Sequence, residues 1–323
     1  MKLRALAAFL FLAVPLTAYD DLGHETVGAI AERELEGTRA LAEARALLAE
    51  GETLATAATW ADRIKAPVET LDPEGAAYVE AHPQHGTYHY CDVPFQQGAY
   101  RLGMAGTRPD DIIQTLKIAI EVLRTPANQR GNPLGIDKRT ALRLVAHLVG
   151  DLHQPLHVGC SYVSGENEFV DPIAGRQGQD DAGGNDFHLG DREGMRLHAY
   201  WDVIAVAKAG EHLGTDDLPG ALMKRSPVQA AWNPSGPIET WPEQWADDTL
   251  AFSPKCFAGI ELHERFLIPA TERRPEEHYE WVVTLPDGYE ARARDIVELE
   301  LPKAGYRLAL LLKAIWPDEL PGA

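Results

Sequence analysis

Hydrophobic residues recur every three or four positions along most of this chain, a spacing typical of amphipathic helices. The pattern predicts helices over residues 24–35, 38–48, 54–64, 110–123, 138–152, 241–252 and 291–315. Asp110 and Asp111 place negative charge at the start of the fourth of these helices, and Asp137 can cap the fifth. The chain is therefore expected to be mainly helical.

Strand signals are few. Residues 186–189 and 195–197 flank a turn at 190–194 and predict a short β-hairpin, and residues 281–285 predict one more strand. Residues 159–184 are rich in Gly, Asp and Asn and predict a long surface loop, of the kind that often lies over a functional site. Without an internal repeat or a low-complexity tract, the expected fold class is all-α, with one mainly helical domain over residues 19–323 and a short hairpin near its site.

The first 18 residues have the features of a secretory signal peptide. Lys2 and Arg4 form a short basic start, an apolar run follows over 5–14, and Ala18 is a small residue at the expected cleavage point. Ten apolar residues are too few to span a bilayer, so we expect no membrane anchor. The mature protein should begin at Tyr19 and be secreted or periplasmic.

Charge and cysteine content restrict the function further. The formal net charge of −19 argues against a basic nucleic-acid groove, unless bound divalent cations reverse the local field. Cys91, Cys160 and Cys256 leave one thiol unpaired even if a disulfide forms, and their spacing matches no CxxC metal site. The sequence does not determine which two would pair.

The strongest chemical signal is the segment 147–157, which contains His147, Asp151 and His157. His147 and Asp151 are four positions apart and share one face of a helix, whereas Pro155 ends that helix and lets His157 approach from another direction. A second His-xxx-Asp pair follows at 198 and 202. One such pair is common in helices. Two pairs flanking a third histidine favour a metal site, and imidazole with carboxylate suits zinc.

Other motifs occur in the same order along the chain, and together they resemble the S1/P1 nuclease family. The resemblance rests on residues 19–27, 59–62, 88–92, 147–157, 183–185, 197–202 and 296–309. It covers nearly all of the mature chain. It implies a mainly helical fold that holds three Zn²⁺ ions.

The resemblance also implies how the ligands are shared. One zinc would be held by Asp62, His89, His147 and Asp151; a second by His157, His198 and Asp202; and a third by His24, Asp151 and the amine and carbonyl of Tyr19. The amine exists only after the signal peptide is removed, and it must lose a proton, from a pKa of about 8, before it binds metal. The family usually has Trp where this chain has Tyr19.

Catalytic and substrate-binding roles follow from the same resemblance. Asp62, Asp151 and Lys65 would be catalytic; Tyr90 would stack on the nucleobase, with Asp92 and Asn185 at its edge. The family usually has Arg in place of Lys65, and lysine supplies charge without the bidentate fork. Alternative interpretations are a solvated charge for Lys65, a core aromatic for Tyr90 and a turn residue for Asn185.

The function implied is zinc-dependent hydrolysis of single-stranded DNA and RNA to 5′-phosphorylated products, with 3′-nucleotidase activity and no protein partner predicted. Two alternatives remain from the sequence. The first is a secreted zinc phospholipase C of the same wider superfamily, which would cleave lipid head groups. The second is a non-catalytic zinc-binding helical protein, although purely structural zinc sites are usually closed and rich in cysteine.

Overall fold

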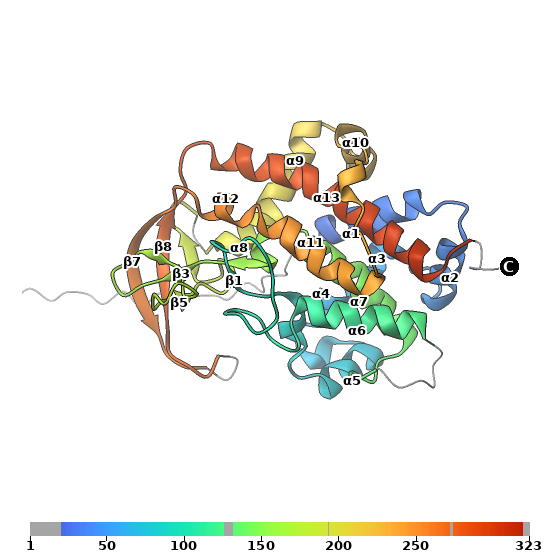
Figure 1. The fold of residues 1–323 in the computed structure, drawn as a ribbon, viewed down its shortest axis with the longest axis horizontal. Coiled ribbons are helices and arrows are strands. Elements are labelled where there is room, and N and C mark those ends of the chain that lie inside the picture. The colour runs from blue at the N-terminus through green and yellow to red at the C-terminus, as the bar shows by residue number, and fades with distance from the viewer. Residues whose placement is uncertain (1–20, 126–131, 193, 272–273, 319–323) are drawn as a thin grey trace, which may run out of the picture.

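The computed structural model describes residues 21–125, 132–192, 194–271 and 274–318. Helices make up most of it, and Figure 1 shows them packed together beside a group of small sheets. The α-helices are α1 Asp21–Glu34, α2 Arg39–Leu47, α3 Leu54–Ala57, α4 Trp60–Arg63, α5 Pro73–Ala81, α6 Ile112–Arg124, α7 Lys138–Asp151, α8 Leu197–Ala199, α9 Ala205–Leu213, α10 Leu218–Arg225, α11 Trp241–Leu250, α12 Ser253–Phe257 and α13 Tyr289–Ile315. Short 3₁₀ or π turns lie at η1 Val68–Thr70, η2 His85–His89, η3 Pro155–His157, η4 Tyr200–Ile204, η5 Ala230–Trp232 and η6 Ile238–Thr240.

The centre of the helical part is α7, which packs against α6, α1 and α13. Asp137 caps α7 by accepting a hydrogen bond from the Thr140 amide at 2.8 Å. From Thr140 onward every residue of α7 is buried, polar ones included. A helix that is buried all round places its polar side chains inside the protein, where they need partners.

Helix α13 is the longest element and lies along α1 (Figure 1). The two helices approach closely at Gly305, where an added Cβ would lie 2.5 Å from Cβ of Ile30. Helix α1 therefore packs against both α13 and α7, and its residue His24 is buried. This packing brings the start of the described chain next to the residues of α7.

Within the described residues the strands form three small sheets. Their bounds are β1 Val93–Pro94, β2 Gly159–Cys160, β3 Tyr162–Val163, β4 Phe169–Val170, β5 Gln179–Asp180, β6 Phe187–Leu189, β7 Glu261–Ile268 and β8 His278–Thr284. β1 pairs in parallel with β2, β3 lies between β4 and β5, and β8 lies between β6 and β7. The longest pairing is the antiparallel one of β7 with β8, which forms one end of the molecule in Figure 1.

The prediction of a mainly helical fold is confirmed, and the differences are local. The helix expected over 54–64 is interrupted between α3 and α4, the loop expected over 159–184 contains short strands, and β7 was not predicted. The expected hairpin is reduced to one antiparallel bridge between His188 and Arg196, because β6 pairs mainly with β8, which is distant in sequence. The expected signal peptide lies outside the described residues. No described helix is long and apolar enough to cross a membrane.

Candidate metal centre

Helix α7 presents His147 and Asp151 on one face, as their spacing predicts. The Nδ1 of His147 donates a hydrogen bond to the carbonyl of Ala58 at 2.6 Å. Its Nε2 is therefore the atom that faces the centre, 3.0 Å from Oδ2 of Asp151. Both residues are fully buried.

Asp62 of α4 and His89 at the end of η2 complete the first ligand group. Nδ1 of His89 lies 3.0 Å from Oδ2 of Asp151. Oδ1 of Asp62 lies 3.6 Å from Nε2 of His147 and 3.7 Å from Nδ1 of His89. Ligand atoms of Asp62, His89 and His147 all lie within 4.8 Å of one another, close enough to hold one ion.

His24 of α1 lies on the other side of the Asp151 carboxylate, with Nε2 3.3 Å from Oδ1. Its ring stacks on that of His147, with centroids 3.9 Å apart. Gly150 makes this approach possible, because a Cβ there would lie 2.9 Å from Nδ1 of His24. His24, His147 and Asp151 form a second possible ligand group. Tyr19, the expected further ligand beside His24, lies outside the described residues.

The third group consists of His157, His198 and Asp202. Nδ1 of His157 donates to the carbonyl of His89 at 2.8 Å, and Nδ1 of His198 donates to that of Gly183 at 2.7 Å. Both rings therefore direct Nε2 toward the centre, where it lies 3.8 Å and 3.3 Å from the Asp202 carboxylate. After α7 ends at Asp151, the turn through Pro155 brings His157 in from another direction, as expected.

Burial and charge shift the pKa values of these groups strongly. Burial opposes ionisation of Asp62, but the charges of Lys65 and His147 outweigh it and lower its pKa to about 2. Burial, with Lys65, lowers the pKa of His89 to about 3. At His157 burial opposes protonation, but the carboxylates of Asp151 and Asp202 raise the pKa to about 9. A cation must displace that proton before it binds, so acid should weaken its binding.

The residues present fit divalent cations. Oδ2 of Asp62, Oδ1 of Asp151 and Nε2 of His157 are buried without a hydrogen-bond partner among the described residues. Buried polar atoms are seldom left so, and here they converge on the same small volume. The donors are nitrogen and oxygen, the set that zinc accepts in sites with an open position.

A cavity of about 190 Å³ opens beside these groups. Lys65, Tyr90, Asp92 and Asn185, the four residues expected from the sequence to act on substrate, all line it together with His89, His157, His198 and Asp202. Nζ of Lys65 lies 2.7 Å from Oδ1 of Asp62, and its side chain is 29% exposed. Tyr90 and Asn185 are half-buried, so each keeps accessible surface in the pocket.

Three residues that support the site had no role assigned from the sequence. Gln154 donates to Oδ1 of Asp202 at 2.9 Å, and its own carbonyl accepts from the Leu156 amide. The guanidinium of Arg108 lies over the Tyr90 ring, 5.1 Å from its centroid. Arg196 donates to the backbone carbonyl of Asn185. Only Gln154 had a sequence signal, its place inside the segment 147–157.

The three cysteines do not take part in the centre. Cys91, Cys160 and Cys256 are buried free thiols, and burial raises their pKa values. His153 likewise lies away from the ligand groups, because its Nδ1 donates to the carbonyl of Val149 and Nη1 of Arg307 contacts its Nε2.

Comparison of the sequence with known proteins identifies the family of this chain. The sequence model of the S1/P1 Nuclease family matches residues 19–317. The chain belongs to the S1/P1 nuclease family. It is similar to "Nuclease S1" of Aspergillus oryzae, with 25% identity over 96% of both chains. It is also similar to "Endonuclease 2" of Arabidopsis thaliana, with 27% identity over 95% of this chain and 93% of that protein. Within the S1/P1 nuclease family this chain is a metal-dependent hydrolase of nucleic-acid ester bonds, which confirms the nuclease interpretation of the sequence over the two alternatives.

Proposed function

We propose that this S1/P1 nuclease is an exported, zinc-dependent enzyme that cleaves single-stranded DNA and RNA and removes phosphate from 3′-nucleotides. The observation that carries the proposal is the position of Asp151, whose two carboxylate oxygens face different histidines beside the 190 Å³ cavity. A carboxylate shared in this way suits adjacent metal ions, as phosphoester hydrolysis often requires.

The proposal includes three Zn²⁺ ions. Asp62, His89, His147 and Asp151 would hold one; His157, His198 and Asp202 a second; and His24, Asp151 and the N-terminus of Tyr19 a third. When bound, the ions would supply an activated water for in-line attack on phosphorus and stabilise the leaving 3′-oxygen, which yields 5′-phosphorylated products. The bound cations would also offset the net charge of −19 where the substrate phosphate binds.

The protein's own residues would orient the substrate. Lys65 lies at the pocket beside Asp62 and can contact a non-bridging phosphate oxygen as a point charge. Tyr90 offers an aromatic face to a nucleobase, worth roughly 1–3 kcal/mol and tolerant of any base. Asp92 and Asn185 lie in the same pocket and can contact the base edge. Because duplexed bases hide their faces, a pocket of this kind favours single strands.

Asp92 has an electrostatic property that suits this role. Burial and the neighbouring carboxylates of Asp180 and Asp181 raise its pKa well above the usual range. Its Oδ1 is buried without a hydrogen-bond partner among the described residues. A neutral carboxyl group can both donate and accept a hydrogen bond, so a base edge could pair with it.

The test is hydrolysis of single-stranded and duplex DNA of the same sequence by the mature protein, with and without a chelator. Chelator-sensitive release of 5′-phosphorylated products, faster from the single strand and restored by Zn²⁺, would support the proposal. Equal rates on both substrates would contradict the single-strand preference. Restoration by Mg²⁺ but not by Zn²⁺ would contradict the zinc assignment.

A further inference from the structure

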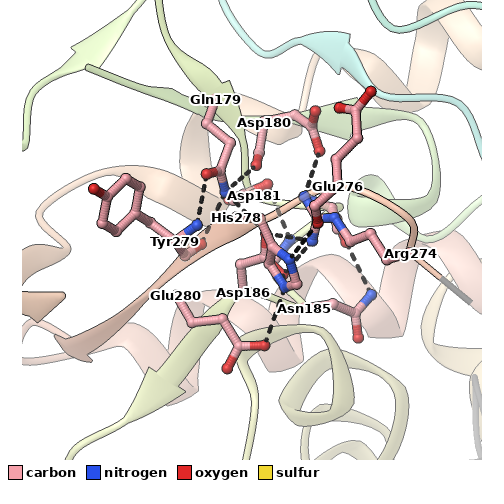
Figure 2. A network of polar contacts seen from close by, with 12 residues as sticks. Gln179, Asp180, Asp181, Asn185, Asp186, Arg274, Glu276, His278, Tyr279 and Glu280 are labelled. Carbon is pink, nitrogen blue, oxygen red and sulfur yellow. Dashed lines mark hydrogen bonds and ion pairs between the residues drawn. The ribbon is translucent and has the colours of Figure 1, made fainter. Parts of the chain in front are cut away.

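Outside the metal centre, a second group of buried titratable residues lies between β8 and residues 179–186. Figure 2 shows its members Asp186, Arg274, His278 and Glu280 gathered next to Asn185. Asp186, His278 and Glu280 have the spacing of a metal site. However, Nη1 of Arg274 lies 2.9 Å from both oxygens of Asp186. Guanidinium groups therefore already supply the positive charge that a metal ion would bring.

Arg196 and His188 both contact the Glu280 carboxylate. Nη1 of Arg196 lies 3.1 Å from its Oε1, and Nε2 of His188 lies 2.5 Å from its Oε2. Burial opposes the ionisation of Glu280, but His188 and Arg196 lower its pKa to about 2. Glu280 therefore remains a fixed negative charge at any pH at which the protein would work.

The adjoining segment 182–184 has an unusual backbone. Ala182, Gly183 and Gly184 have φ angles of +52°, +60° and +85°, all in the left-handed region. Ala182 is strained there, and such conformations persist only where the surrounding structure holds them. At Gly183 a side chain is also excluded by space, since a Cβ would lie 2.4 Å from the carbonyl oxygen of Leu156.

This left-handed turn serves the site in two ways. The carbonyl of Gly183 accepts the hydrogen bond that orients His198. Ala182 and Asn185 line the substrate cavity. A small movement of this turn would therefore displace the candidate metal ligand His198 or the predicted base contact Asn185.

Side chains hold the end of this turn that leads into Asn185. Oδ1 of Asp181 accepts a hydrogen bond from the Gly184 amide at 3.1 Å. The guanidinium of Arg196 donates to the carbonyl of Asn185, and the same Nη1 contacts Glu280. The backbone joins this end to strand β8 as well, because the Trp281 amide donates to the carbonyl of Asp186 at 2.8 Å. Arg196 adds the side-chain link from Asn185 itself to Glu280 of β8.

We propose that Arg196, anchored by Glu280, is a positioning residue that holds Asn185 in place for the nucleobase. The proposal rests on the proposed function, because it takes Asn185 as a base contact. It assigns the β7–β8 hairpin a role in substrate recognition, although none of its residues lines the cavity. Arg196 itself contacts no reacting atom and acts through Asn185.

The test separates base binding from metal binding. Affinities of the zinc-loaded protein for adenosine 5′-monophosphate and for inorganic phosphate are measured by calorimetry in the wild type and in Arg196→Met. Loss of one base contact should weaken nucleotide binding about tenfold. Phosphate binding should change less than about twofold, because phosphate would use the metals and Lys65 but not Asn185. Arg196→Lys, which keeps a donor and the charge, should recover part of the nucleotide affinity.

Arg265→Met is the matched control. Arg265 lies on β7 and donates to the backbone carbonyl of Gly165 at 2.9 Å, so its replacement removes a guanidinium of the β7–β8 hairpin without breaking the link between Arg196 and Asn185. It should leave both affinities unchanged. An equal loss of both ligands in Arg196→Met would mean that Arg196 supports the metal centre, and unchanged binding of both would mean that it positions nothing; either result overturns the proposal.

Failure of the proposed function would look different. If the wild type binds the nucleotide no more tightly than it binds phosphate, it has no base pocket. That result would overturn the role proposed for Arg196 as well. A wild type that binds the nucleotide preferentially, with the Arg196 effect present, but cleaves no nucleic acid would overturn only the proposed function.

Discussion

Oδ2 of Asp151 lies 3.0 Å from Nε2 of His147, while its other carboxylate oxygen faces away, 3.3 Å from Nε2 of His24. One side chain at the end of α7 therefore lies between two candidate ligand groups. Burial opposes its ionisation, but His147 and His157 lower the pKa of Asp151 well below the usual range. The carboxylate is thus ready to bind cations on both sides.

Asp151→Ala should lose metal and activity together. Residues that merely orient a metal ligand already cost 10–100-fold when removed, so loss of this shared ligand should lower kcat/KM by more than about 100-fold. Zinc content by mass spectrometry and hydrolysis of single-stranded DNA measure the two effects. The matched control is Asp137→Ala on the same helix, which removes only the N-cap and should cost about 1 kcal/mol of stability with normal activity. Near-normal turnover in Asp151→Ala would rule out the shared ligand.

Gln154→Leu should weaken binding of one ion only. The Gln154 amide holds the Asp202 carboxylate, so its loss should reduce affinity at the His157–His198–Asp202 group by about 10–100-fold. Titration with a competing zinc chelator would show one weakened site and two unchanged ones. Gln244→Leu removes a similar side-chain amide that binds Ser235 and Thr240, and should leave all sites unchanged. Uniform weakening of every site in Gln154→Leu would instead indicate general destabilisation.

Gly150→Ala should displace His24. The new Cβ would lie 2.9 Å from Nδ1 of that ring, so the ring must shift and its metal group should open. Misplaced catalytic geometry of this size should lower kcat by about tenfold or more. Gly210→Ala in α9 meets no heavy atom within 4 Å and should instead stabilise the fold slightly. Full zinc content and normal kcat in Gly150→Ala would show that the close approach is not needed.

An extended N-terminus should impair the enzyme. If the amine of Tyr19 binds the third zinc, a single residue added before it removes the chelating amine and should reduce both zinc content and activity. The comparison is the mature protein against one with an added alanine before Tyr19. Equal zinc content and rates in the two proteins would contradict the N-terminal ligand.

Stability should depend on pH through Asp181. Burial raises its pKa from the ordinary 3.8 to about 7, so the folded state holds the proton more tightly than the unfolded state. Its contribution is complete below about pH 4 and is lost as the pH rises to about 7. The melting temperature of the wild type minus that of Asp181→Asn should therefore fall across this window. Asp191→Asn, at an exposed aspartate, should show no such slope. A constant difference for Asp181→Asn would contradict the shifted pKa.

Local spacing was enough to predict much of the fold and of the site. The four-residue interval places His147 and Asp151 on one helix face, and Pro155 ends that helix, because both effects depend only on backbone geometry. The helical class followed from the hydrophobic period, and the candidate ligands from their order along the chain in a known family. Strand β7 was missed because it has no buried face: every one of its residues is exposed or half-buried.

Long-range contacts decided the rest. The hairpin expected at 186–197 is reduced because β6 pairs with β8, about ninety residues later in the chain. No local sequence pattern predicts that pairing. Hydrogen bonds to backbone carbonyls determine which ring nitrogen of each histidine faces the metal centre. The pairs are His147 with Ala58, His157 with His89, and His198 with Gly183. No sequence pattern indicates where a backbone carbonyl will lie. By itself, the sequence determined which side chains could bind metal and which helix carries two of them. Only the tertiary structure determined their orientation and the shared position of Asp151, because these depend on contacts between segments that packing alone brings together.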